Sequence, residues 1–87
     1  MAPKIVMYSK TTCPFCHRAE SLLRQRGVED LEIIQIDIER ERRAEMIERA
    51  GRFTVPQIFI DDRHVGGCDD LVALDRAGGL MPLLQPQ

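Results

Sequence analysis

The feature that most constrains this chain is a pair of cysteines, Cys13 and Cys16, placed between two segments of different periodicity. Before the pair, Lys4 to Tyr8 has the apolar character of a strand, and after it residues 14–26 carry a helical pattern that stops at Gly27. A Cys-x-x-Cys pair at a strand-to-helix junction is typical of a redox site. A thiol there lies near unpaired N–H groups and the positive end of the helix dipole, which favour the reactive thiolate.

Length and charge exclude several classes of protein. The chain has 87 residues, enough for one domain over residues 1–87, and its formal net charge of −2 argues against a nucleic-acid binder. Basic residues do cluster at 40–43, but acidic residues alternate with them, which is typical of a solvated helix face. No apolar run could span a membrane, and no secretory signal begins the sequence. We therefore expect a cytoplasmic protein whose cysteine pair cycles between dithiol and disulfide.

The patterns predict alternating strands and helices. Expected strands cover Lys4–Tyr8, Leu31–Ile38, Val55–Ile60 and Arg63–Val65, and expected helices cover Pro14–Arg26, Glu39–Ala50 and Asp69–Ala77, with a last helical turn at Leu80–Leu84. Asp37 is the expected cap of the second helix, and Asp61-Asp62 the turn of a hairpin. Two strands joined through a helix are parallel, and a hairpin adds antiparallel strands. The sequence thus predicts an α/β fold, a four-stranded mixed sheet in the order βαβαββα with helices on both faces.

The two cysteines are expected to differ in role. Cys13 precedes the helix, where exposure and the dipole are greatest, and Lys10 adds positive charge three residues earlier, so Cys13 is the candidate nucleophile. Cys16, one turn into the helix, is expected to be more buried and to resolve a mixed disulfide. The alternative is a pair of core cysteines that lie close together, because free cysteine packs like a small hydrophobic residue.

Two further segments are candidates for binding. Proline at the start of a central strand, as at Pro56, is disfavoured outside special conformations, so either a cis Val55-Pro56 bond or an ordinary trans proline is open. A cis bond would free the Val55 backbone to pair with an extended substrate. Residues 66–70, Gly-Gly-Cys-Asp-Asp, would let a ligand approach the backbone, with Asp69 or Asp70 facing an ammonium group. The other interpretation is a turn with a capping aspartate.

Taken together, these segments resemble one family. Cys13-Pro14-Phe15-Cys16, Thr54-Val55-Pro56 and Gly66-Gly67-Cys68-Asp69-Asp70, at these separations, are similar to the dithiol glutaredoxins of the short bacterial type. The resemblance covers nearly the whole chain. It implies a thioredoxin fold, a cis Pro56 and a groove for glutathione.

Carried over by position, the resemblance makes Cys13 the nucleophile and Cys16 the resolving thiol. It also implies a set of glutathione-binding residues, namely Thr54 and Val55 at the cysteinyl backbone, Lys10 and Gln57 near the glycine carboxylate, and Cys68, Asp69 and Asp70 near the γ-glutamyl end. Phe15 stands where the family usually has tyrosine, so its ring can wall the groove without a hydroxyl contact.

The implied activity is glutathione-dependent thiol–disulfide exchange, with glutathione as co-substrate and no tightly bound cofactor. The implied partners are glutathione and disulfide-containing or glutathionylated proteins, ribonucleotide reductase among them, acted on by a monomer that binds no metal, nucleic acid or membrane. Two alternatives stay open. Cys13-x-x-Cys16-His17 matches a c-type haem attachment motif, and the cysteines could hold zinc or an iron–sulfur cluster shared with a second chain.

Overall fold

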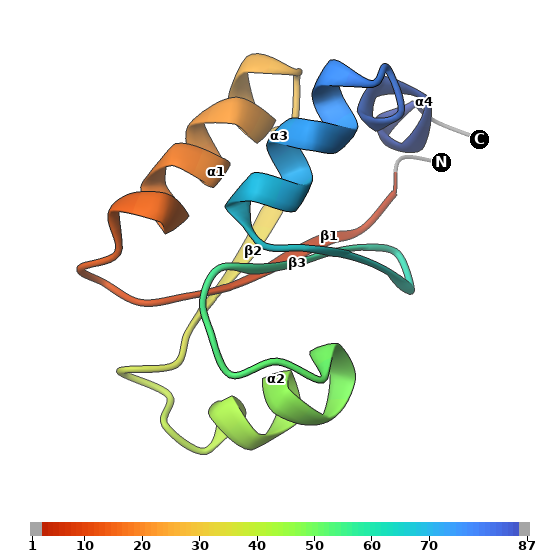
Figure 1. Ribbon diagram of the computed structural model, residues 1–87. Coiled ribbons are helices and arrows are strands. Elements are labelled where there is room, and N and C mark those ends of the chain that lie inside the picture. The colour runs from red at the N-terminus through yellow and green to blue at the C-terminus, as the bar shows by residue number, and fades with distance from the viewer. Residues whose placement is uncertain (1–2, 86–87) are drawn as a thin grey trace.

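The order of strands and helices agrees with the sequence prediction in a computed structural model that describes residues 3–85 (Figure 1). The strands are β1 (Ile5–Ser9), β2 (Leu31–Gln35), β3 (Gln57–Ile60) and β4 (Arg63–Gly66). The helices are α1 (Pro14–Gln25), α2 (Arg42–Ala50), α3 (Cys68–Arg76) and α4 (Leu80–Leu84). The expected last turn at Leu80–Leu84 is therefore confirmed.

The four strands form one mixed sheet in the order β2-β1-β3-β4, which confirms the predicted sheet. β1 runs parallel to β2 and antiparallel to β3, and β4 completes an antiparallel hairpin with β3. All five residues of β1 are buried, as expected for a strand with neighbours at both edges and helices on both faces. The carboxyl ends of β1 and β2 point to the same edge, and the cysteine pair follows β1 there.

Helices cover both faces of the sheet, as predicted. Figure 1 shows α1, α3 and α4 on one face and α2 alone on the other. Because successive strand residues point to opposite faces, Ile5 and Met7 of β1 join the cluster under α1 and α3, whereas Val6 and Tyr8 join the cluster under α2. The two apolar clusters lie on opposite faces of the same sheet, and packing against them holds the helices in place.

α1 is built as its sequence predicts, one residue shorter at its C-terminus. Cys13 is the N-cap and Pro14 occupies the first turn, where its missing N–H costs no hydrogen bond. Gly27 follows the helix with a φ of +94°, a left-handed conformation that glycine adopts without a steric penalty. The buried stripe is Cys16, Ala19 and Leu23. This packing against the sheet fixes the first turn, and with it Cys13.

The connection from β2 to α2 differs from the prediction. β2 ends at Gln35 rather than Ile38, and α2 begins at Arg42 rather than Glu39. Asp37 does not cap α2; its carboxylate accepts hydrogen bonds from the backbone N–H of Thr11 at 3.1 Å and from the Thr11 hydroxyl at 2.5 Å. Those bonds hold the pKa of Asp37 below its usual value. Asp37 thus ties the loop after β2 to the loop that precedes the cysteine pair.

α2 is anchored to the sheet by one apolar and one polar contact. Met46 is fully buried and packs in the cluster with Tyr8, whereas Ala44, two residues earlier, is exposed. The buried Tyr8 hydroxyl donates to the carboxylate of Glu45 and accepts a 2.9 Å hydrogen bond from Arg49. Burial, and then the Glu45 carboxylate, raise the pKa of Tyr8. Side chains of α2 therefore provide hydrogen-bond partners for the buried hydroxyl of Tyr8.

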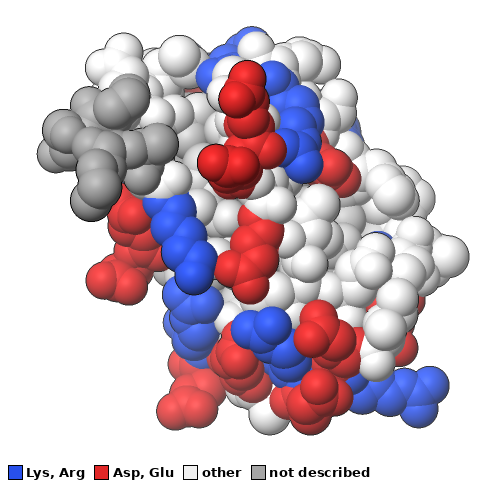
Figure 2. Space-filling model, turned by 180° about the vertical axis from the view of Figure 1, so that it is seen from behind, with Lys and Arg blue, Asp and Glu red and all other residues white. Residues whose placement is uncertain are grey.

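The outer side of α2 carries the mixed charge that the sequence predicts. Arg42 pairs with Glu39 and Glu45 within one turn on either side. Figure 2 shows acidic and basic side chains side by side at the lower end of the molecule, which is the α2 side. Arg42 is therefore neutralised by its neighbours in sequence. Among residues 3–85, no helix combines the length and the apolar character that crossing a membrane requires.

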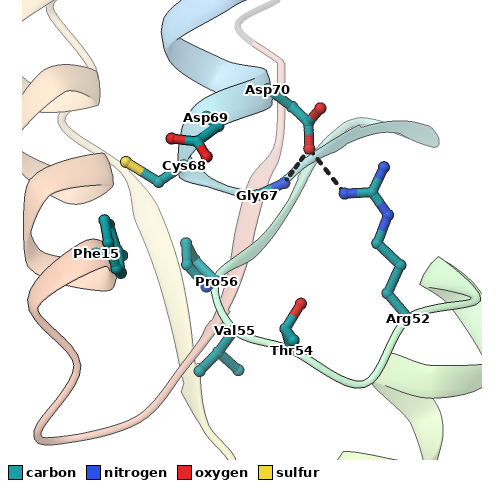
Figure 3. Close-up of a pocket in the computed structure, with 9 residues that line it drawn as sticks. All are labelled: Phe15, Arg52, Thr54, Val55, Pro56, Gly67, Cys68, Asp69 and Asp70. Atoms are coloured by element: carbon teal, nitrogen blue, oxygen red, sulfur yellow. Dashed lines mark hydrogen bonds and ion pairs between the residues drawn. The ribbon is translucent and has the colours of Figure 1, made fainter.

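The β3–β4 hairpin turns at Asp61-Asp62, as predicted, with Asp61 at a φ of +52°. β3 begins at Gln57 rather than Val55, so residues 54–56 form a loop at the edge of the sheet next to the cysteines. β4 extends one residue further than expected, to Gly66, and α3 begins at Cys68 rather than Asp69. The loop before β3 and the start of α3 then lie side by side (Figure 3).

Candidate active site

The cysteine pair lies at the start of α1, and its two members have different surroundings. Cys13 and Cys16 are joined as a disulfide, with their Cα atoms 5.2 Å apart, a separation that a disulfide spans without backbone movement. Cys13 is 9% exposed and Cys16 only 1%. Cys16 is thus the more buried of the two, as the sequence predicts.

The helix directs a hydrogen-bond donor at that sulfur. The backbone N–H of Cys16 donates to Cys13 Sγ over 3.2 Å, and no acidic residue occupies the first turn of α1. The N–H and the helix dipole both favour negative charge on the sulfur. His17 turns away, with its Nε2 3.4 Å from the Thr11 carbonyl oxygen. The first turn therefore directs an N–H donor and the positive end of its dipole at this sulfur.

A hollow opens beside the pair, between α1, the loop before β3 and the start of α3 (Figure 3). Its lining residues are Phe15, Arg52, Thr54, Val55, Pro56, Gly67, Cys68, Asp69 and Asp70. At about 220 Å³ it is smaller than the pockets of about 300–1,000 Å³ that enclose a small-molecule ligand. A ligand would lie along the hollow with one side exposed. The exposed ring of Phe15 forms the wall nearest the cysteines.

The loop before β3 presents its backbone to this hollow. The Val55-Pro56 peptide bond is cis, which is the alternative that the family resemblance implied. Within residues 3–85, neither the N–H nor the carbonyl of Val55 has a backbone hydrogen-bond partner. Both groups are therefore available to an extended ligand, which is the mode of recognition that adds a strand to free main-chain groups.

Gly67 and Asp70 form part of the opposite wall, and Gly66 directly precedes them in the chain. Asp70 Oδ2 accepts from the Gly67 N–H at 2.9 Å and from the Arg52 guanidinium at 2.7 Å, and these two bonds lower the pKa of Asp70. Gly66 has a φ of +117°, and a Cβ there would lie 2.4 Å from Asp70 Oδ2, so only glycine leaves room for the carboxylate. Asp70 thus caps α3 and pairs with Arg52, while Asp69 is exposed at the rim.

Cys68 is the third cysteine, and it lies in the same hollow at the first position of α3. Its side chain is 5% exposed and forms no disulfide. Burial raises the pKa of its thiol, so Cys68 is poorer in thiolate than an exposed cysteine. It packs in the cluster under α1 and α3.

Two of the expected binding residues do not line the hollow, and one residue without an expected role does. Lys10 lies on the exposed loop before the cysteines and does not line the hollow. Gln57 is fully buried and its side-chain amide bonds to other residues of the protein. Arg52, in contrast, lines the hollow although the sequence analysis did not single it out. The sequence shows only a lone arginine two residues before Thr54. Its place in the hollow follows from its ion pair with Asp70, which the fold brings opposite it. Within residues 3–85, no group of three or more potential metal ligands occurs.

These features define a class of protein. A dithiol at a helix N-terminus, a cis-proline loop beside it and a mixed sheet covered on both faces form the active site of a thiol–disulfide oxidoreductase with a thioredoxin fold.

Comparison with known proteins identifies the family. The Glutaredoxin family model matches residues 5–65. Glutaredoxin 3 of Escherichia coli is 58% identical over 81 residues, which are 93% of this chain and 96% of that protein. A glutaredoxin of Pseudomonas aeruginosa is 52% identical, covering 94% and 96% respectively. The crystal structure of a buckwheat glutaredoxin–glutathione complex superposes with a TM-score of 0.86 at 35% identity, covering 94% of this chain and 76% of that one.

The chain therefore belongs to the glutaredoxin family, as its three motifs indicated. Members of this family are glutathione-dependent thiol–disulfide oxidoreductases that use glutathione as co-substrate, and this chain is one of them. The expected activity and the thioredoxin fold are both confirmed.

Proposed function

We propose that Cys13 is the nucleophile and Cys16 the resolving thiol of this glutaredoxin. The observation that carries the assignment is the N–H of Cys16, which donates to Cys13 Sγ at 3.2 Å while Cys16 itself is buried. The donor stabilises charge on one sulfur only. Cys16 is held within bonding distance of Cys13 but away from a bulky substrate.

With a glutathionylated protein, the Cys13 thiolate attacks the glutathione sulfur. A disulfide forms between Cys13 and glutathione, and the protein leaves as a thiolate that takes up a proton. The thiolate of a second glutathione then attacks that glutathione sulfur, which releases glutathione disulfide and regenerates Cys13. Overall, one free glutathione is consumed, and it leaves as glutathione disulfide with the glutathione that was bound to the protein.

With a protein disulfide, the mixed disulfide forms between Cys13 and the client. Cys16 attacks Cys13 Sγ, the reduced client leaves, and two glutathiones reduce the Cys13–Cys16 disulfide in turn. Glutaredoxin potentials of about −200 to −230 mV lie close to the cytosolic glutathione potential, so both directions are accessible. Only this route needs Cys16.

For glutathione, we propose the hollow beside Phe15 as the site. The free N–H and carbonyl of Val55 fit the cysteinyl backbone, and Thr54 adjoins them. The first turn of α3, at Cys68, offers unpaired N–H groups to the γ-glutamyl carboxylate, and the exposed Asp69 carboxylate fits the ammonium. Lys10, on the exposed loop outside the hollow, is the cation proposed for a glycine carboxylate that extends beyond it.

The clients proposed are disulfide-containing and glutathionylated proteins, with ribonucleotide reductase the one that the family resemblance suggests. A pair that is recycled by glutathione requires the reducing glutathione pool, and this supports the cytoplasm as the compartment. The openness of the hollow to a macromolecule, and a chain that supplies both thiols itself, support action as a monomer.

The assignment is tested by trapping. Cys16→Ser, incubated with glutathione disulfide, should carry one glutathione on Cys13, located by mass spectrometry of proteolytic peptides. Cys13→Ser should carry none at position 16. Peptide mapping separates either adduct from one on Cys68, and an adduct on Cys16 in place of Cys13 would reverse the roles.

A further inference from the structure

Gln57, the first residue of β3, is fully buried, and both ends of its side-chain amide form hydrogen bonds beside the active site. Its Nε2 donates to the carbonyl oxygen of Thr54 at 3.0 Å, with a longer 3.4 Å approach to the Thr54 hydroxyl. The amide therefore holds the loop that carries the free Val55 backbone from behind, on the side away from the hollow.

The other end of the amide fixes a histidine. Gln57 Oε1 lies 2.7 Å from His64 Nε2. Because the Thr54 carbonyl can only accept, the amide nitrogen must face Thr54 and the amide oxygen must face His64. His64 Nε2 must then carry a proton and donate it. The chain of donors runs in one direction, from His64 through Gln57 to Thr54.

The hairpin, and not the hollow, holds the imidazole in place. His64 is on β4, where it is the register partner of Phe59, and the two ring centroids are 4.9 Å apart at an angle of 30°. The guanidinium of Arg49, from α2, lies 4.1 Å from the Phe59 ring centroid. His64 is half-buried and does not line the hollow. Its hydrogen bond to Gln57 thus links the hairpin to residues 54–56, the loop outside the sheet.

We propose that His64 is a positioning residue for glutathione recognition, acting through the Gln57 amide to hold the Thr54 carbonyl and so the free Val55 backbone in their binding orientation. The proposal rests on the proposed role of the Val55 loop in binding glutathione. Without the His64 donor, the buried Gln57 oxygen lacks a partner, which costs free energy unless the amide rotates. A rotated amide no longer holds Thr54, and the loop loses its orientation.

Two variants separate the donor from the packing. His64→Phe keeps a ring on Phe59 but has no N–H, whereas His64→Gln places an amide N–H at a similar distance from Cβ. Each is compared with wild type for KM and kcat on a glutathionylated peptide, with glutathione reductase and NADPH in excess. The rate at which dithiothreitol reduces the Cys13–Cys16 disulfide is measured in parallel, because that reaction does not use the glutathione site.

His64→Phe should raise KM by about tenfold, the ratio given by a loss of about 1.4 kcal/mol, with kcat and the dithiothreitol rate unchanged. His64→Gln should restore KM toward wild type. An unchanged KM in His64→Phe, equal KM values in both variants, or a parallel fall of kcat and the dithiothreitol rate would each overturn the proposal. If wild type itself does not turn over the peptide, or Cys13→Ser does, the proposed function fails instead.

Discussion

The backbone N–H of Cys16 points at the sulfur of Cys13 from 3.2 Å, across the first turn of α1. One donor and one dipole thus act on a single sulfur, and Pro14 between the two cysteines holds the turn in helical conformation.

This relationship predicts the reactivity of Cys13. In Cys16→Ser, which keeps the backbone N–H, Cys13 should react with iodoacetamide at pH 7 faster than the thiol of free glutathione, because more of it is thiolate. The rate is followed by mass spectrometry of the Cys13 peptide, with the buried Cys68 as an internal control that should react slowly. A Cys13 rate no greater than that of glutathione would contradict the predicted stabilisation of the thiolate.

The two adjacent aspartates should separate by function. Asp69 is exposed at the rim, so Asp69→Asn should raise KM for glutathione about two- to fivefold, the scale of one exposed charge pair, and leave the melting temperature unchanged. Asp70 caps α3 and pairs with Arg52, so Asp70→Asn, unlike Asp69→Asn, should lower the melting temperature. Kinetics and thermal melts of the two variants decide. A KM effect in Asp70→Asn alone would reverse their roles.

A second ion pair predicts how stability depends on pH. Arg26, at the end of α1, holds both carboxylate oxygens of Asp75 on α3 at 2.8 Å, and this pairing keeps the pKa of Asp75 below its ordinary value. The unfolded chain therefore binds this proton at a higher pH than the folded protein does. The stabilisation is present above about pH 4, the unfolded value, and is lost as pH falls through the folded pKa.

Asp75→Asn should accordingly melt a few degrees lower than wild type at pH 7, with the difference shrinking in acid. Asp62→Asn is the matched control, because Asp62 lies in the exposed hairpin turn and forms no ion pair within residues 3–85. Thermal melts at pH 7 and pH 3 suffice. A difference from wild type that stays constant between these two pH values would show that the charge pair is not its cause.

Packing beneath α2 gives a fourth prediction. Met46 is fully buried against the sheet, so Met46→Ala should lower the free energy of unfolding by about 2–5 kcal/mol. Ala44→Ser, on the exposed side of the same helix, should change it by about 0.5 kcal/mol or less. Urea denaturation measures both. Equal effects of the two substitutions would mean that Met46 does not anchor α2.

The sequence predicted best where local patterns agree with tertiary packing. Helical spacing and a glycine stop identified α1, and the cysteine pair identified its first turn. The same logic misplaced the start of α2, because the carboxylate of Asp37 is used by Thr11, distant in sequence, rather than by the helix. A capping residue can be recognised from local sequence only when no remote donor competes for it.

The site was predicted in outline and revised in detail for the same reason. The family motifs identified the Val55 backbone and the acidic pair. Whether Gln57 faces a ligand or the interior depends on where His64 lies across the hairpin, and the importance of Arg52 depends on Asp70, 18 residues later. Neither relation leaves a local pattern.

The central claim is that Cys13 takes part in every turnover and Cys16 only in dithiol reduction. The most direct measurement is the glutathione-dependent reduction of a glutathionylated peptide by wild type, Cys16→Ser and Cys13→Ser, in a coupled assay with glutathione reductase. We predict that Cys16→Ser retains this activity but no longer reduces a protein disulfide. We predict that Cys13→Ser has neither activity. Full deglutathionylation by Cys13→Ser would contradict the account.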